Sequence, residues 1–287
     1  MPKLYRDYDR EELDVQYNAQ ATVGDITPFI REYTELSSKA YATLDCRRQI
    51  PFGPSAEETL DLFPAGGNAP LFVFIHGGYW RMLSSADSSF MAPNFVDQGV
   101  AVAAVNYTLR PHATLDQIVA EVRRSIAWLY NNCSAYDLNP ERIFIGGSSA
   151  GGHLAGMLIS GGWHEEFGVP NDIIKGCLVL SGLYELEPVA LSYANDWLNI
   201  DKETARRNSP IYALPEKGCP LILSYGGSET AEFKRQSEDY AAHWRSAGFE
   251  TDCFERTERN HFDIPLELCI KGSILDRKVL DLINRDN

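Results

Sequence analysis

The stretch "RIFIGGSSAGGHLAG" (residues 142–156) decides the fold, because it places two adjacent serines among glycines at the end of an apolar run. Residues 143–163 carry no Asp, Glu, Lys or Arg, and this uncharged segment is long enough to cross a membrane as a helix. This region holds seven glycines and His153. Each glycine costs a helix about 1 kcal/mol relative to alanine, and the Gly-Gly-Ser-Ser cluster is typical of a turn. We therefore predict a strand, a sharp turn and a buried helix here.

Short apolar segments alternate with helical patterns along the rest of the chain. Residues 71–76 and 100–107 are continuously apolar, like strands covered on both faces, and residues 57–63 alternate like a half-buried strand. Further strands are predicted at residues 142–147, 175–182, 220–227 and 250–257. Helices are predicted at residues 114–130, with Thr114 and Gln117 as a capping box, and at residues 231–247 and 265–283. This alternation predicts a doubly wound α/β fold with a mostly parallel sheet and helices on both faces.

We expect residues 1–287 to form a single domain. An N-terminal arm covers about residues 1–45, before the first predicted strand. Residues 184–215 interrupt the rhythm of strands and helices, and we interpret them as a small helical, cap-like insertion over the strand ends.

Composition limits the classes of function. With 26 Lys+Arg against 40 Asp+Glu, the net charge of -14 would repel phosphate backbones and anionic lipid surfaces. We therefore expect neither nucleic acid nor a membrane as a partner. Six scattered cysteines form no C-x-x-C pair, so we expect reduced thiols and no metal site. The sequence has no phosphate loop or dinucleotide fingerprint, so we expect no cofactor. The N-terminus has no apolar signal segment, which favours a cytoplasmic location, and a homodimer is compatible with the sequence.

Residues that could take part in catalysis follow four of the predicted strands. These are "HGGYWR" after residues 71–75, "GGSSAGG" after residues 142–145, "GGSET" after residues 221–225 and "ERNHFDIP" after residues 250–257. Binding sites of open α/β sheets lie at the carboxyl ends of the strands. A serine, an acid and a histidine are expected to meet there, in the chain order of an α/β hydrolase.

Ser149 is the predicted nucleophile. A nucleophile elbow needs small residues two positions before and after the serine, because strand and helix approach closely at a strained turn. Gly147 and Gly151 meet this need around Ser149, whereas Ser148 has Gly146 and Ala150. The glycines favour Ser149, with Ser148 as the alternative.

His261 is the predicted base, since a serine alcohol needs a base within hydrogen-bond reach. It follows the last predicted strand and precedes the C-terminal helix. His76 is expected to brace the glycine loop, and His153 to pack or hydrogen-bond beneath the site. The other histidines, expected to be ordinary polar residues, are His112, His164 and His243.

Glu229 is predicted to orient His261, because it lies just past a strand end. Glu232 is the nearest competitor, but it stands where the next helix should begin, and the helix dipole explains a carboxylate there. Asp263 is too close to His261 in the sequence to be the expected partner.

Backbone N–H groups of Gly78, Tyr79 and Ala150 are predicted to bind the oxyanion that forms on acyl attack. Trp80, Ser148 and Tyr184 are predicted to contact the substrate. For Trp80, a place in the core is an equal alternative.

With these residues in place, the chain resembles the kynurenine formamidase (arylformamidase) branch of the α/β hydrolases, near the hormone-sensitive-lipase-like carboxylesterases. The resemblance extends over nearly the whole chain, and "HGGYW" and "ETAEFKRQS" (residues 229–237) are its more specific parts. It implies an α/β-hydrolase fold, oxyanion amides at Gly78 and Tyr79, the nucleophile at Ser149 and the carboxylate at Glu229.

The chain departs from this family at three positions. Kynurenine formamidases commonly read G-H-S-A-G-A-H-L, whereas this sequence has Ser148 for the histidine and Gly152 for the second alanine. Its acid is Glu229, where animal members usually carry aspartate. These differences leave the chemistry of acyl transfer intact and bear on the choice of substrate.

The sequence therefore predicts a metal-free serine hydrolase that cleaves a small acyl group through an acyl-enzyme. The resemblance implies N-formyl-L-kynurenine or a related arylformamide as substrate. Hydrolysis of short-chain or aryl esters is the alternative, because "GSSAGG" is equally familiar among broad carboxylesterases. An alternative of another class is a non-catalytic ligand-binding protein of the same fold.

Overall fold

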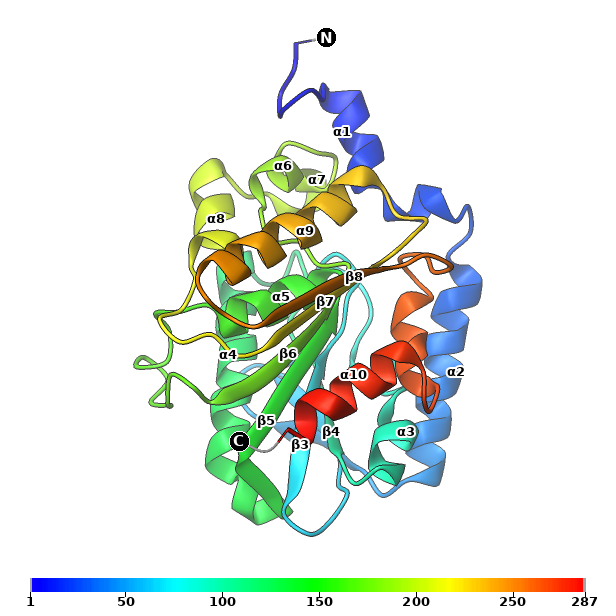
Figure 1. Ribbon diagram of the computed structural model, residues 1–287, viewed down its shortest axis with the longest axis vertical. Helices are drawn as coiled ribbons and strands as arrows, with labels where there is room; N and C mark the ends of the chain where they lie inside the picture. The colour runs from blue at the N-terminus through cyan, green and yellow to red at the C-terminus, as the bar shows by residue number, and fades with distance from the viewer. Residues whose placement is uncertain (1, 286–287) are drawn as a thin grey trace.

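One sheet of eight strands runs through the computed structural model, which describes residues 2–285 (Figure 1). Its order is β1-β2-β4-β3-β5-β6-β7-β8. β2 is antiparallel to both of its neighbours, and every other pair is parallel. The mostly parallel α/β-hydrolase fold is thereby confirmed. The strands are β1 Arg47–Pro51, β2 Thr59–Phe63, β3 Ala69–Ile75, β4 Ala101–Val105, β5 Leu138–Ser148, β6 Ile174–Leu180, β7 Leu221–Gly226 and β8 Thr251–Arg256.

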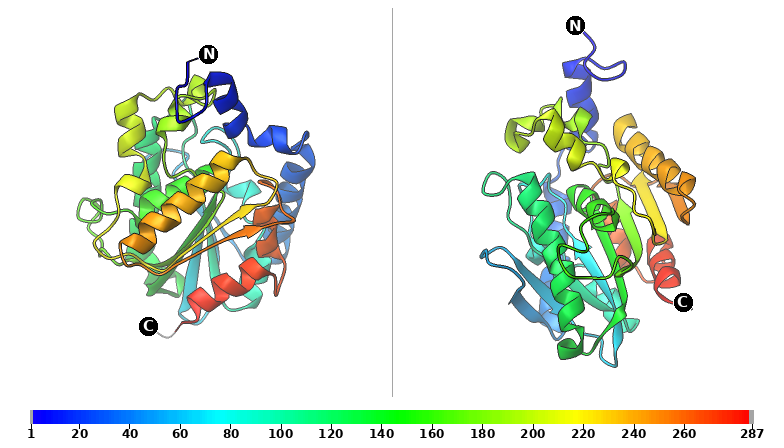
Figure 2. Two further views of the ribbon diagram at one scale, coloured as in Figure 1. Left: turned by 45° about the horizontal axis from the view of Figure 1, so that its top comes forward. Right: turned by 90° about the vertical axis from the view of Figure 1, so that its left-hand side faces the viewer.

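Helices lie on both faces of this sheet (Figure 2). The α-helices are α1 Arg10–Tyr17, α2 Thr27–Thr43, α3 Ala92–Asp97, α4 Leu115–Asn132, α5 Ala150–Ile159, α6 Glu187–Ala190, α7 Asn195–Leu198, α8 Lys202–Arg207, α9 Ala231–Ser246 and α10 Ile274–Ile283. The short 3-10 helices are η1 Ala19–Thr22, η2 Ser85–Asp87, η3 Cys133–Tyr136, η4 Pro210–Tyr212 and η5 Ile264–Cys269.

Side chains of the central strand β3 pack in two hydrophobic cores, because successive side chains of a strand point to opposite faces. Leu71, Val73 and Ile75 join the core that contains residues of α4, α5 and α9. Phe72 and Phe74 join the core that contains residues of α2, α3 and α10. Burial on both faces explains why this strand is a continuous apolar run.

The uncharged region at residues 143–163 is divided between a strand and a helix. β5 ends at Ser148, and α5 begins at Ala150 and has only ten residues. Among residues 2–285, no helix combines the length and the apolar character needed to span a bilayer. The predicted strand, turn and buried helix are confirmed.

Two segments gather at one end of the sheet, where α1, α6, α7 and α8 lie together (Figure 1). The helices α6, α7, α8 and η4 come between β6 and β7, in the insertion expected at residues 184–215. The N-terminal arm forms α1, η1 and α2, which the sequence did not predict as helices. Thr230 Oγ1, just before α9, donates to the backbone oxygen of Gln16 at 2.5 Å and so holds the arm.

Two predictions of secondary structure need correction. The single helix expected at residues 265–283 is wrong, because the chain turns between η5 and α10. Gly272 has φ +78° there, and the Ser273 hydroxyl caps α10 by accepting the Asp276 N–H at 3.1 Å. The edge strand β1 was not predicted, since its sequence "RRQIP" is mostly polar and exposed.

The capping box of α4 yields a prediction about stability. Thr114 Oγ1 accepts the Gln117 N–H at 3.2 Å, and Gln117 Oε1 accepts the Thr114 N–H at 2.7 Å. Thr114→Ala should lower the free energy of unfolding by about 1 kcal/mol, because one N–H of the first turn loses its acceptor. Urea denaturation measures the change, and Thr114→Ser is the matched control. Equal stability of the two variants would contradict the role of this cap.

Candidate active site

Ser149 occupies a strained turn between β5 and α5. Its backbone has φ +57° and ψ −119°, a region that residues with a Cβ rarely adopt. A Cβ on Gly147 would lie 2.5 Å from the carbonyl carbon of Gly151. A Cβ on Gly151 would lie 2.6 Å from the His76 oxygen and closer still to that of Ile75. Packing therefore requires glycine at the two positions that favoured Ser149 in the sequence.

His261 and Glu229 form a buried pair beside this turn. His261 Nδ1 lies 2.9 Å from Glu229 Oε2, and their side chains are 5% and 1% exposed. The other carboxylate oxygen accepts the Ser181 hydroxyl at 2.5 Å and the Gly226 N–H at 2.6 Å. Because a carboxylate accepts only, it holds the proton on Nδ1 and leaves Nε2 of His261 as an acceptor.

The two competing carboxylates have other partners. Glu232 accepts the Tyr17 hydroxyl at 2.8 Å and is bridged by the Arg235 guanidinium at 2.9 and 2.8 Å. Asp263 accepts the backbone N–H of Asn260 at 2.7 Å. Of the three acids weighed in the sequence, the structure brings Glu229 to His261.

The loop after β3 presents its backbone to the same place. Gly78, Tyr79 and Trp80 have φ of +98°, +51° and +57°. The N–H groups of Gly78 and Tyr79 have no acceptor within residues 2–285. Ala150 is the first residue of α5, so its N–H has no partner inside the helix. These three unpaired donors have the character of an oxyanion hole.

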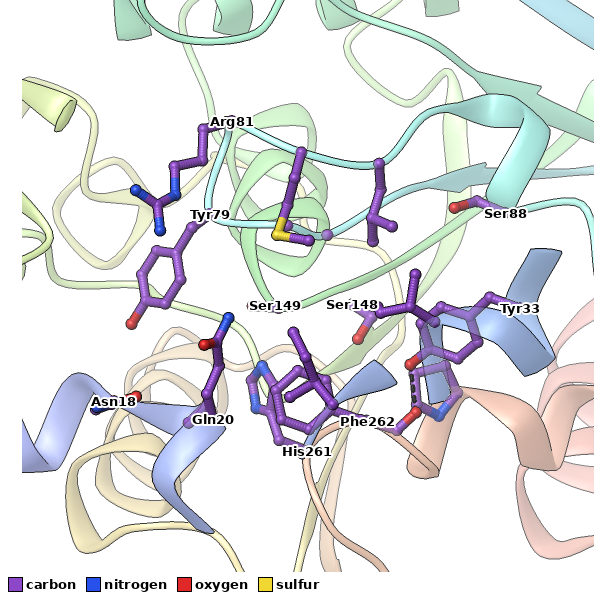
Figure 3. Close-up of a pocket in the computed structure, with 18 of the residues that line it drawn as sticks. Asn18, Gln20, Tyr33, Tyr79, Arg81, Ser88, Ser148, Ser149, His261 and Phe262 are labelled. Atoms are coloured by element: carbon purple, nitrogen blue, oxygen red, sulfur yellow. Dashed lines mark hydrogen bonds between the residues drawn. The ribbon is translucent and has the colours of Figure 1, made fainter. Parts of the chain in front are cut away.

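A cavity of about 160 Å³ opens over Ser149 and His261 (Figure 3). One water needs roughly 10–15 Å³ of such space, so the cavity has room for an organic molecule. Ser148, Gly78 and Tyr79 also lie on its wall. Much of the remaining wall is aromatic, with Tyr33, Phe74, Phe90, Tyr193 and Phe262.

Comparisons with known proteins identify the family of the chain. A family model described as BD-FAE matches residues 61–170. A kynurenine formamidase from Salmo salar is 31% identical over 286 residues, which cover 93% of this chain and 94% of that protein. A kynurenine formamidase from Danio rerio is 29% identical over 298 residues, with 98% and 99% coverage. The chain belongs to the kynurenine formamidase branch of the α/β hydrolases.

A solved structure supports the fold of this hydrolase independently. A candidate thioesterase from Silicibacter sp. TM1040 superposes with a TM-score of 0.81 at 24% identity, covering 92% of this chain and 97% of that one. At this identity the likeness establishes the arrangement of strands and helices, and the chemistry must be argued from the site.

The part of the hydrolase's site that the N-terminal arm supplies was not predicted from the sequence. Asn18, Gln20, Ile26, Ile30 and Tyr33 all line the cavity. No local motif marks these residues, because they reach the site only through packing of the arm. The one available signal was the family resemblance of residues 10–18, at the start of the arm.

Two predicted substrate contacts are corrected by the structure. Trp80 is fully buried, and its Nε1–H donates to His153 Nδ1 at 3.2 Å. Tyr184 is also fully buried and stacks on Tyr240 with ring centroids 4.4 Å apart. Neither lines the cavity, so both belong to the packed core, whereas Ser148 does face the cavity.

His76 and His153 lie beneath the site, where the sequence analysis placed them. His76 stacks on Tyr107 at 4.1 Å, and its Nδ1–H donates to the Gly77 oxygen at 2.9 Å. His153 accepts from Trp80 and donates through Nε2 to the Asn208 oxygen at 2.7 Å. Burial lowers the pKa of each imidazole to about 4, so both are neutral supports of the loop at neutral pH.

The crowded elbow predicts that Gly151→Ala damages both stability and activity. The added methyl group meets backbone oxygens that cannot move without shifting β3, which should lower the free energy of unfolding by about 1–3 kcal/mol. Hydrolytic rate and urea denaturation measure the two effects. The control is Gly161→Ala beyond the other end of α5, where the nearest atom to a new Cβ is 3.2 Å away. Equal effects of the two variants would contradict the close approach at Gly151.

The buried histidines predict a dependence of stability on pH. Between pH about 6.5 and about 4, the unfolded chain binds protons at His76 and His153 that the folded protein excludes. The free energy of unfolding should therefore fall as pH is lowered through this window, by about 1.4 kcal/mol per pH unit for each histidine.

Urea denaturation across this window tests the effect with His153→Gln, which should reduce the slope. His243→Gln replaces an exposed imidazole and serves as the control. A slope in His153→Gln equal to that of the wild type would show that His153 is not held neutral.

Proposed function

We propose that this hydrolase cleaves N-formyl-L-kynurenine or a closely related arylformamide through a covalent acyl-enzyme at Ser149. One observation carries the proposal. His261, held by Glu229, lines the cavity together with the elbow serine, in a chain that belongs to the kynurenine formamidase branch.

In the first step, Ser149 Oγ attacks the formyl carbon and its proton moves to His261 Nε2. Glu229 keeps the imidazole oriented and stabilises the imidazolium that forms. The carbonyl oxygen becomes an oxyanion, which the N–H groups of Gly78, Tyr79 and Ala150 stabilise. These donors are fixed before reaction, so little reorganisation is needed as charge develops.

In the second step, the carbon–nitrogen bond breaks and His261 gives its proton to the leaving aryl amine. A water molecule then attacks the formyl-enzyme while His261 accepts one of its protons. The bond between carbon and Ser149 Oγ breaks, Oγ regains the proton, and formic acid leaves and releases its own proton to water to become formate. No group beyond water and these side chains is needed for the balance of the reaction.

Hydrolysis of short-chain or aryl esters is the second candidate, and the side chain before the nucleophile favours it. Ser148 adds only a small side chain to the cavity wall, where kynurenine formamidases commonly carry histidine, and so leaves room for an acyl group larger than formyl. Steady-state kcat/KM on N-formyl-L-kynurenine, p-nitrophenyl acetate and p-nitrophenyl butyrate separates the two candidates. The arylformamidase proposal predicts the highest value for the formamide, and equal or higher values for the esters would overturn it.

The identity of the nucleophile has its own test. Ser149→Ala should lower kcat/KM by about 10⁴-fold or more and abolish labelling by a fluorophosphonate, because the attacking oxygen is gone. Ser148→Ala should retain the covalent label. Labelling that survives in Ser149→Ala and disappears in Ser148→Ala would reverse the assignment. A wild-type protein that takes no label would favour a non-catalytic binding role.

A further inference from the structure

The cavity wall has a charge opposite to that of the whole chain. Arg81 is the one Arg or Lys among the residues that line it, and none of them is Asp or Glu. The chain as a whole carries a net charge of -14. Glu229 lies behind His261 with both oxygens hydrogen-bonded. Apart from the titratable His261, the wall therefore offers one cation and no anion to a ligand.

Among residues 2–285, Arg81 has no carboxylate partner. Its guanidinium makes neither an ion pair nor a hydrogen bond to this part of the protein and lies over the ring of Trp197. Arg235, by contrast, pairs with Glu185, Glu232 and Asp239. In a chain with 40 acidic residues, an unpaired arginine at the cavity leaves its donors free for a ligand.

The guanidinium of Arg81 is nevertheless held in place. Its carbon lies 3.7 Å from the ring centroid of Trp197. Trp197 in turn donates through Nε1 to the backbone oxygen of Tyr79 at 3.1 Å. Arg81 is thus stacked on an aromatic face that is tied to the oxyanion loop, which reduces the entropy lost when it binds a ligand.

The polar groups of the cavity lie on two sides of the nucleophile. Figure 3 shows Arg81, Tyr79, Asn18 and Gln20 on one side of Ser149 and His261, with Tyr33 and Ser88 on the other. The carboxylate of Asp14 contacts the nearby Tyr193 N–H, but it is paired with Arg10 at 2.8 Å. A ligand that enters this side meets an unpaired cation and two carboxamides.

We propose that Arg81 binds a carboxylate on the leaving group of the substrate and so selects aryl substrates that carry this group. This inference rests on the proposed acyl transfer at Ser149. The planar guanidinium matches a carboxylate, and the aromatic wall accommodates the aryl ring. Because Arg81 is exposed at the cavity mouth, its contact strengthens binding and takes no part in proton transfer.

Arg81→Gln tests the proposal with two substrates that differ at the carboxylate, N-formyl-L-kynurenine and its carboxamide, which keeps the same amino group. The variant should raise KM for the acid by about tenfold to a hundredfold, the range of one charge-assisted hydrogen bond, while kcat stays within about threefold. KM for the carboxamide should stay unchanged. Arg81→Lys should restore part of the loss, since it keeps the charge without the planar fork.

Arg206→Gln is the matched control, because Arg206 is also an exposed arginine stacked on an aromatic ring, Tyr212, at 4.4 Å. It removes the same charge away from the cavity and should change neither KM. Equal losses of Arg81→Gln on acid and carboxamide would overturn the proposal in favour of a structural role. Unchanged KM values for both would overturn it outright.

A second pair of substrates separates failure of this inference from failure of the proposed function. If the wild type releases no formate, the arylformamidase proposal fails, and 4-acetoxybenzoate is compared with phenyl acetate. If Arg81 binds the carboxylate, Arg81→Gln should lower the ratio of kcat/KM for the charged ester to that for the neutral ester by about tenfold. An unchanged ratio would show that Arg81 does not bind the carboxylate.

Discussion

Close packing between Gly151 and the backbone at the end of β3 is the constraint on which the rest of the site depends. No side chain fits between α5 and the oxygens of Ile75 and His76, so the helix must begin directly against the strand. The turn before it takes the strained conformation that projects Ser149 from the sheet. Since β3 and β5 are parallel neighbours, the loop with Gly78 and Tyr79 emerges beside the serine.

Two glutamates three residues apart, Glu229 and Glu232, have separate roles in holding the site together. Glu229 follows β7. One of its carboxylate oxygens accepts hydrogen bonds from Ser181 and Gly226, and the other lies against His261. Glu232, in the first turn of α9, accepts the hydroxyl of Tyr17 and so holds the N-terminal arm. The arm carries the wall of the cavity on one side. Glu229 and Glu232, on either side of the start of α9, thus link the orientation of His261 to the position of the cavity wall.

The sequence predicted the parts of this site that depend on local sterics. Glycines around Ser149 and the position of His261 after the last strand were visible without a structure. Contacts made through tertiary packing were not visible, which is why Tyr33 was missed and Tyr184 was expected to contact the substrate. The break at Gly272 did have a local signal, but the apolar pattern on both sides of it favoured one continuous helix.

The most direct test of the account is a crystal structure of the protein after reaction with an aryl phosphonate that mimics the tetrahedral intermediate. The account predicts phosphorus bonded to Ser149 Oγ, with the phosphoryl oxygen about 3 Å from the N–H groups of Gly78, Tyr79 and Ala150. It also predicts that His261 remains paired with Glu229. A bond to Ser148, or a phosphoryl oxygen directed away from these three donors, would contradict it.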